Sequence, residues 1–97
     1  MEEKAKIIAE LLKVLANENR LLILCRLIKG PQTVSKLAES VPNITQSALS
    51  QHLALLKAHR ILDSEKSGQS ITYRISDERV EKVMAVLRQY YCNEEDV

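Results

Sequence analysis

Residues 45–57 read Thr45-Gln46-Ser47-Ala48-Leu49-Ser50-Gln51-His52-Leu53-Ala54-Leu55-Leu56-Lys57, and they form the most informative pattern in the chain. At about 100° per residue, a helix places Leu49, Leu53 and Leu56 within one narrow stripe. The opposite side is small and neutral, with Ser47, Ser50, Gln51, Ala54 and Ala58. Short hydroxyls and amides suit a helix laid against the base edges of DNA. We therefore interpret the stretch as a recognition helix; a core helix with an ordinary polar face is the alternative.

The segment before this helix completes a helix-turn-helix. Thr33 can cap a short helix that runs to about Val41, and Pro42-Asn43 breaks that helix. Thr45 then caps the longer helix. A short helix, a turn and a longer helix in this order form the helix-turn-helix arrangement.

The hydrophobic period changes after residue 60. Ile71, Tyr73 and Ile75 alternate with polar residues, and residues 62–66 face them across Ser67-Gly68-Gln69-Ser70. Alternation on both sides of a short turn that contains glycine predicts a β-hairpin. A hairpin directly after a recognition helix is a wing.

Three more helices are predicted in the remaining segments. The first covers residues 3–16, and the second covers residues 18–29 behind a cap at Asn17. The second is apolar almost all round, so it should be the central helix. The last helix is expected to begin at a Ser76 cap and to run through Tyr91.

The predicted fold class is mainly α with a β-hairpin wing. It is a winged helix-turn-helix of about five helices in the order α-α-α-α-β-β-α, and residues 1–97 form a single DNA-binding domain. The first and last helices each present more apolar surface than one small domain can cover. We therefore expect a homodimer through these two helices. The alternative is that both helices complete the core of a monomer.

Composition narrows the class of protein. The 97 residues include 14 basic and 13 acidic side chains, for a net charge of +1. Residues 45–76 carry +2 and residues 77–97 carry −3, which is weak evidence for a nucleic-acid face. Apolar runs fall short of the roughly 18 residues of a membrane span, and charges near the N-terminus exclude a secretory signal. We therefore expect a cytoplasmic protein that does not contact the membrane, in which two distant cysteines are not presumed to form a structural disulfide.

Three motifs in this order resemble the ArsR family of small dimeric winged-helix repressors. Residues 12–24, LxxLANENRLxIL, resemble the junction between the first two helices of the family. Residues 46–53, QSALSQHL, resemble its recognition helix, and residues 68–73, GQxxxY, resemble its wing. The resemblance covers nearly the whole chain, and it implies a double-stranded DNA operator that is an inverted repeat.

The resemblance also implies two kinds of DNA contact. The residues that would reach bases, here called the base readers, are Gln46, Ser47, Ser50 and Gln51. The residues that would meet phosphates, here called the phosphate anchors, are Lys57, Lys66 and Arg74. Amides and hydroxyls read donor and acceptor patterns, whereas Lys and Arg neutralise phosphate and set the salt dependence. His52 lies on the edge of the apolar stripe, and we interpret it as a packing residue.

Many members of the family sense metals, and their ligand sets are not recognisable in this chain. The expected third helix holds no thiol, and after Asp77 the last helix holds no histidine. A zinc site needs three or four well-placed ligands. We therefore expect no metal and no other cofactor, with a metal-responsive repressor of the same family as the alternative.

Cys25 in the second helix and Cys92 at the end of the last are the only cysteines of the chain. The pair resembles the thiol-sensing branch of the family, in which cysteines at these places form a disulfide or sulfur-bridged link under oxidant or reactive sulfur. The alternative is that Cys25 is a small core residue and Cys92 an incidental surface thiol.

The charges around the two thiols differ. Arg26 and Lys29 stand near Cys25 and favour its thiolate, although burial opposes them, whereas residues 94–95 beside Cys92 are acidic. We therefore expect Cys25 to attack first and Cys92 to resolve. A bond between them requires Cα atoms within about 7 Å, so the last helix must lie against the second at that level.

Together these features predict a sequence-specific transcriptional regulator. We expect a repressor that is released when Cys25 and Cys92 are oxidised or bridged by reactive sulfur; the alternatives are metal sensing and no sensing through the cysteines. An enzyme is not expected, because the Cys-x-x-Cys and βαβ pattern of small thiol oxidoreductases is missing. A winged helix that binds protein would favour an acidic recognition surface, and residues 45–58 hold no acid.

Overall fold

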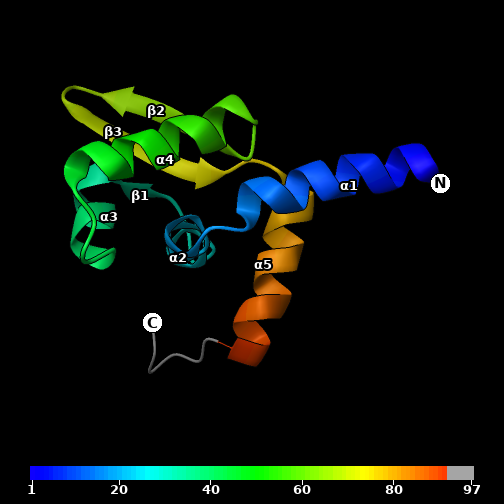
Figure 1. Ribbon diagram of the computed structural model, residues 1–97. Coiled ribbons are helices and arrows are strands. Elements are labelled where there is room, and N and C mark those ends of the chain that lie inside the picture. The colour runs from blue at the N-terminus through cyan, green and yellow to red at the C-terminus, as the bar shows by residue number, and fades with distance from the viewer. Residues whose placement is uncertain (92–97) are drawn as a thin grey trace.

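The computed structural model describes residues 1–91, and five helices and three strands follow one another in this part of the chain (Figure 1). They are α1 (Glu2–Leu15), α2 (Glu18–Leu27), β1 (Gln32–Thr33), α3 (Val34–Ser40), α4 (Gln46–Ala58), β2 (Leu62–Ser67), β3 (Ser70–Ile75) and α5 (Glu78–Tyr91). The predicted winged helix-turn-helix is confirmed. No helix among residues 1–91 is long and apolar enough to cross a membrane.

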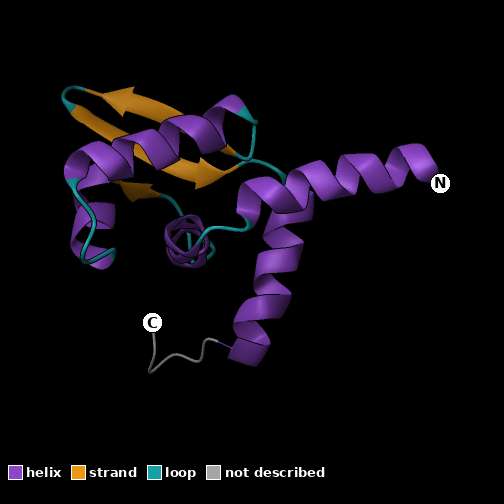
Figure 2. Cartoon of the chain, in the orientation of Figure 1, coloured by secondary structure: helices purple, strands orange, loops and turns teal. Residues whose placement is uncertain are grey.

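The central position of α2 follows from its composition, and Figure 2 looks along its axis with the other helices around it. Ile23, Leu24 and Leu27 are buried in one cluster with apolar residues of α3, α4 and α5. The helix begins where predicted, because the Asn17 side chain accepts hydrogen bonds from the first backbone N–H groups. It ends at Leu27 rather than at residue 29, because the Gly30 N–H bonds back to the Leu27 carbonyl at 3.0 Å and tightens the last turn.

The helix-turn-helix forms as the sequence predicts. Thr33 Oγ1 accepts from the Lys36 N–H at 3.1 Å and begins α3, and Thr45 Oγ1 accepts from the Ala48 N–H at 3.0 Å and begins α4. Asn43 between the two helices has a φ of 63°, a left-handed conformation that asparagine tolerates better than most residues. This conformation turns the chain from the end of α3 toward the start of α4.

The wing is the predicted hairpin with one addition. Strands β2 and β3 pair from Leu62 opposite Ile75 to Ser67 opposite Ser70, and Gly68 at the turn has a φ of 61°. The addition is β1, whose Gln32 lies opposite Tyr73, so the sheet order is β1-β3-β2. Two residues are too few to show an alternating pattern, which is why the sequence does not predict this strand.

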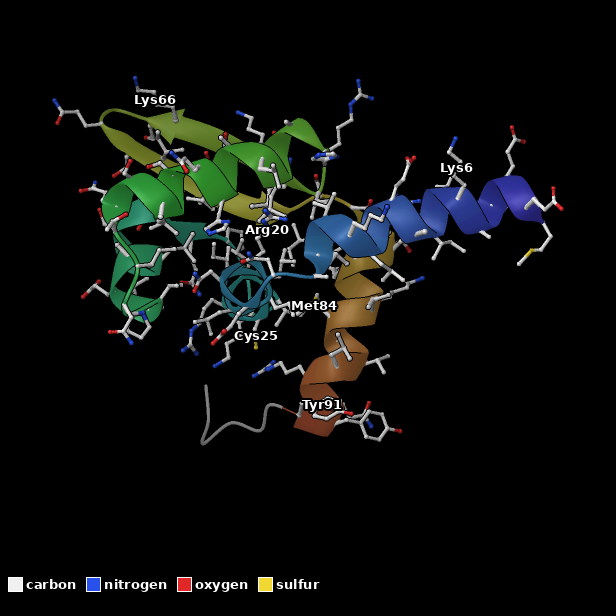
Figure 3. The ribbon with its side chains drawn as sticks, in the orientation of Figure 1. Lys6, Arg20, Cys25, Lys66, Met84 and Tyr91 are labelled. Atoms are coloured by element: carbon white, nitrogen blue, oxygen red, sulfur yellow. The ribbon has the colours of Figure 1, made fainter. Side chains whose placement is uncertain are left out.

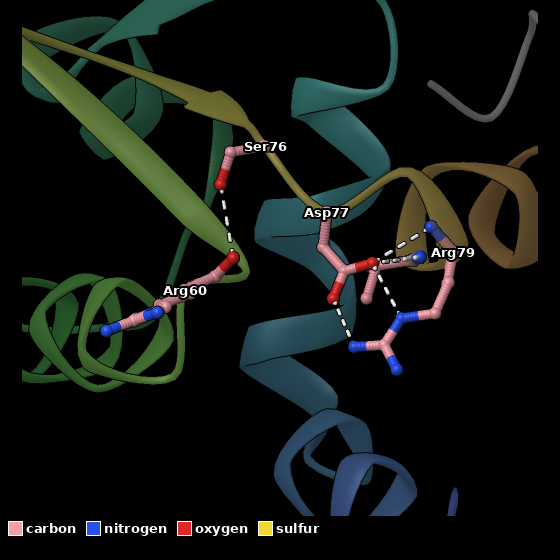
Figure 4. Close-up of polar contacts among 5 residues, drawn as sticks. Arg60, Ser76, Asp77 and Arg79 are labelled. Atoms are coloured by element: carbon pink, nitrogen blue, oxygen red, sulfur yellow. Dashed lines mark hydrogen bonds and ion pairs between the residues drawn. The ribbon is translucent and has the colours of Figure 1, made fainter.

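The start of α5 differs from the prediction by one residue (Figure 4). Asp77, not Ser76, caps the helix, because its Oδ1 accepts from the Arg79 N–H at 2.9 Å and the Val80 N–H at 3.4 Å. The Ser76 hydroxyl instead donates to the Arg60 carbonyl at 3.1 Å. That contact ties the end of the wing to the end of α4, which draws Ser76 away from the helix.

Two helices leave apolar side chains in solvent. In Figure 1, α1 projects away from the body of the molecule, and only Leu15 among its residues is buried. Ile7, Ile8 and Leu12 on α1 are each about half exposed, at 54%, 49% and 51%. The exposed apolar residues of α5 are Val83, Val86, Leu87, Tyr90 and Tyr91.

Candidate nucleic-acid interface

The outer face of α4 carries the four base readers. All of them are exposed, whereas Leu49, Leu53 and Leu56 on the other side are buried at 1% or less. The burial of the leucine stripe fixes the rotation of the helix about its axis, so the amides and hydroxyls face outward. An uncharged face with donors and acceptors can approach base edges without repulsion from phosphate.

A polar hollow of about 460 Å³ lies beside this face. Its walls come from α4, β1, α3 and the wing, and its lining residues are Thr33, Val34, Ser35, Gln46, Ser50, Leu53, Gln69, Ser70, Ile71 and Tyr73. From the sequence, only Gln46 and Ser50 of this set were predicted to contact DNA. The pairing of β1 with β3 brings Thr33 and Tyr73 to the walls of this hollow, and no local pattern signals that pairing.

The three phosphate anchors fall into different surroundings. Lys57 stands in the last turn of α4, and its Nζ lies 2.6 Å from Ser64 Oγ on β2. Lys66 is exposed near the tip of the wing. Arg74 donates to Asp63 at 2.9 Å in an exposed ion pair across the two strands.

The pairing of the strands separates these cations. Side chains alternate between the two faces of a strand, so Lys66 shares a face with Ser64, which contacts α4 through Lys57. Arg74 and its register partner Asp63 stand on the other face. Lys57 and Lys66 therefore belong to one side of the wing, and Arg74 to the side turned away from α4.

His52 is a half-buried residue of α4 whose Nδ1 accepts a hydrogen bond from Arg20 Nε at 3.3 Å. Desolvation, followed by the positive charge of Arg20, lowers the pKa of His52 below its usual 6.5. The packing role predicted for His52 thus includes a polar contact with α2.

A second, largely apolar cavity of about 440 Å³ lies between α2 and α5 (Figure 3). Buried Cys25 lines it together with Glu18, Leu21, Leu22, Met84, Leu87, Arg88 and Tyr91. Tyr91 directly precedes Cys92, which lies outside the described residues. Residues of α5, Tyr91 among them, therefore line the same cavity as Cys25.

Two charged residues, Glu18 and Arg88, line this cavity. Arg26 donates from Nε and Nη2 to the Ser40 carbonyl at 3.4 and 3.3 Å, toward α3. Arg88 lies one turn before Tyr91 on the same face of α5, a spacing that could have identified it. Residues 1–91 hold no cluster of three or more His, Cys, Asp or Glu side chains fit for a metal ion.

Comparison with known proteins identifies the family. The family described as "Bacterial regulatory protein, arsR family" matches residues 17–64. The chain is 36% identical to the HTH-type transcriptional regulator YgaV of Escherichia coli over 92 residues, which covers 95% of this chain and 93% of that protein. It is 37% identical to the transcriptional activator HlyU of Vibrio cholerae, with 95% and 84% covered.

Solved structures agree with the sequence comparison. The fold superposes on reduced HlyU from Vibrio cholerae with a TM-score of 0.90, at 36% identity and with 96% and 97% of the two chains covered. It also superposes on the transcriptional repressor BigR from Xylella fastidiosa with a TM-score of 0.84, at 31% identity and with 97% and 95% covered. The chain belongs to the ArsR family of DNA-binding transcriptional regulators.

Proposed function

We propose that this regulator is a cytoplasmic, homodimeric repressor that binds an inverted-repeat operator and leaves it when Cys25 and Cys92 become linked. The observation that carries the proposal is the cavity between α2 and α5, which is lined by both Cys25 and Tyr91. The agents of the link are an oxidant or a reactive sulfur species. Among the relatives, HlyU is described as an activator and BigR as a repressor. A reporter gene behind the target promoter, measured with and without this protein, tests whether it represses or activates transcription.

The DNA contacts proposed are those of the base readers and the phosphate anchors. The exposed, acid-free face of α4 supports the first group, and the position of Lys57 and Lys66 on one side of the wing supports the second. Residues with hydroxyl groups also line the polar hollow, and hydroxyl donors suit the phosphate and sugar oxygens of DNA. Base contacts would then specify the operator, and the wing would position the protein on it.

Substitutions separate the two kinds of contact. Ser50→Ala or Gln51→Ala is expected to relax the preference at one base position by about 1–3 kcal/mol, because a good base contact contributes that much. Lys66→Ala and Arg74→Ala are expected to weaken all sequences alike and to lower the salt slope by about one. Binding to matched and scrambled duplexes at several salt concentrations measures both effects.

The matched control is Lys82→Ala, which removes a cation that pairs with Glu78 at 3.0 Å on α5. It should leave the salt slope unchanged. Arg74 stands on the face of the wing turned away from α4, so an unchanged slope for Arg74→Ala would show that this face does not meet phosphate. An unchanged slope for Lys66→Ala as well would refute the wing contact altogether.

The proposed switch begins at the thiolate of Cys25. With a peroxide, its sulfur attacks one oxygen, and water leaves with formation of a sulfenic acid; the Cys92 thiol then displaces a second water to form the disulfide. With a persulfide donor, the outer sulfur passes to Cys25 and the donor leaves as a thiol. Attack by Cys92 on the inner sulfur then expels hydrogen sulfide. Either route links the last helix to the helix that precedes the helix-turn-helix.

The test combines mass spectrometry with DNA binding. Treated wild type is expected to contain a covalent link between the peptides of Cys25 and Cys92 and to lose about 5–150-fold in operator affinity, the usual range for coupling between two sites. Cys25→Ser and Cys92→Ser should bind DNA like the reduced wild type and keep it after treatment. Cys25→Ala repeats the test without a hydroxyl in an apolar cavity.

Three outcomes would overturn the switch or replace it. Release of DNA from the doubly substituted protein after treatment would exclude the cysteines as sensors. Loss of affinity in wild type without a link between the two peptides would exclude the bridge. Release by added zinc from the reduced protein would favour the metal-responsive alternative.

A further inference from the structure

Arg20 at the start of α2 connects α1 to the recognition helix. Its Nη1 donates to the Val14 carbonyl in the last turn of α1 at 2.8 Å, and its Nε donates to Nδ1 of His52 on α4 at 3.3 Å. Figure 3 shows Arg20 among α1, α2 and α4. One guanidinium therefore contacts a helix with an exposed apolar face and the helix that carries the base readers.

The Val14 end of this connection is set by the end of α1. The last four carbonyls of a helix have no partner within the helix. The Ala16 N–H donates a hydrogen bond to the Leu12 carbonyl at 2.9 Å, and the Asn17 N–H donates to the Leu15 carbonyl at 2.8 Å. Arg20 bonds the Val14 carbonyl between them, and its charge suits the negative end of the helix dipole.

The His52 end is set by the chemistry of the ring. Nδ1 can accept a hydrogen bond only when it carries no proton, so the ring is neutral with its hydrogen on Nε2. His52 stands between exposed Gln51 and buried Leu53. Because His52 belongs to α4, the hydrogen bond to its ring joins Arg20 to the helix that carries the base readers.

Arginine suits this double contact, and lysine does not. The guanidinium is planar and donates from separate nitrogens in fixed directions, whereas an ammonium is a single point on a flexible stem. One rigid guanidinium therefore bonds both the Val14 carbonyl and the His52 ring, which fixes the position of the ring relative to that carbonyl.

We propose that Arg20 is a positioning residue, which through His52 sets the angle of α4 relative to α1 and so determines the half-site spacing that the dimer accepts. The inference rests on the proposed dimer through α1 and α5. In a dimer built on α1, the orientation of α4 relative to α1 fixes how far apart the two recognition helices lie. Operator spacing follows that separation, because half-sites must match it along the duplex.

The test compares variants that keep or remove the acceptor at residue 52. His52→Gln retains an oxygen that Arg20 can donate to, whereas His52→Leu keeps bulk and removes the acceptor. Arg20→Lys breaks the same contact from its other end. Circular dichroism and light scattering first establish that each variant is folded and dimeric.

The probes are a duplex selected from a random library with the wild type, and the same duplex with one base pair added or removed between the half-sites. We expect the wild type and His52→Gln to discriminate among these duplexes equally. His52→Leu and Arg20→Lys should lose on the order of fivefold or more of that discrimination, at the low end of coupling between sites. The salt slope should stay the same, since neither residue is proposed to bind phosphate.

Four results would overturn the inference. A monomeric wild type would refute the dimer and this proposal together. A dimeric His52→Leu with the discrimination of the wild type would refute the positioning role alone. A salt slope lowered by about 0.9 would show that the residue binds phosphate directly. Should His52→Leu not fold, unchanged discrimination by a dimeric Arg20→Lys would refute the positioning role in its place.

Discussion

His52 is held between the reading face and the core, and its environment favours the neutral ring. Partial burial removes water that would stabilise the imidazolium, and the charge of Arg20 repels it, so its pKa is lowered from 6.5. In the unfolded chain neither effect operates. The unfolded state therefore binds a proton at His52 more readily than the folded state does.

This difference predicts a pH dependence of stability. Above pH about 6.5, His52 is neutral in both states and does not lower the free energy of unfolding. As the pH falls from about 6.5 through the lower pKa of the folded state, the unfolded chain gains the proton first and the free energy of unfolding should decrease. One proton contributes at most about 1.4 kcal/mol per pH unit. His52→Gln should flatten the curve measured by urea unfolding between pH 7 and 5. Equal curves for wild type and His52→Gln would contradict the prediction.

At the scale of elements, the entry into α5 depends on Asp77. Its carboxylate accepts from the backbone N–H groups of Arg79 and Val80 and pairs with the Arg79 guanidinium at 2.7 Å (Figure 4). The hydrogen bond from the Arg79 side chain is the main reason that the pKa of Asp77 lies below its usual range. Since α5 carries Val80 and Met84 into the core, its first turn anchors the helix to the domain.

Removal of this cap should destabilise the protein. Asp77→Ala is expected to cost about 1 kcal/mol in the free energy of unfolding, because a capping side chain contributes about 0.5–2 kcal/mol. Asp77→Asn keeps an acceptor for the backbone and should recover most of the loss. Ser76→Ala removes only the contact to the Arg60 carbonyl and should cost less. A larger cost for Ser76→Ala than for Asp77→Ala would reverse the assignment of the cap.

At the scale of the whole molecule, the unburied faces of α1 and α5 support association. α1 buries only Leu15, and half-exposed Ile7, Ile8 and Leu12 lie along it. A helix with so little packing gains most of its stability from contacts made elsewhere. A second copy would cover these side chains and those of α5, which is the proposed homodimer.

Substitution on α1 tests the dimer. Ile8→Glu places a charge in the proposed interface, and both subunits of a two-fold symmetric dimer carry the substitution. Because Ile8 is about half exposed, each copy should lose about 0.8–1.5 kcal/mol, and the two together should weaken the dimer about 10–150-fold. Light scattering across a concentration series measures the effect, and Lys13→Glu, a charge change at an exposed position of α1, is the control. A monomeric wild type, or an undiminished Ile8→Glu dimer, would contradict the arrangement.

Local patterns in the sequence are enough to predict the helix-turn-helix, the wing and the starts of three helices. Asn17, Thr33 and Thr45 cap the helices for which they were predicted, because a cap depends on a side chain and a backbone group two or three residues apart. The burial of the leucine stripe of α4 was equally predictable, since periodicity is a local property. Outward exposure of the base readers follows from the same stripe.

Contacts between distant segments could not be predicted in this way, because they form only when whole elements pack together. Strand β1 exists because Gln32 meets Tyr73, and Ser76 leaves the helix cap because the Arg60 carbonyl is near. The Arg20 to His52 bond and the cavity of Cys25 likewise join residues more than 30 positions apart. Such pairs depend on how whole elements pack, and a hydrogen bond or an apolar contact leaves no periodic trace in either partner segment. Packing therefore determined which polar groups meet, while local pattern determined which helices and strands were available to pack.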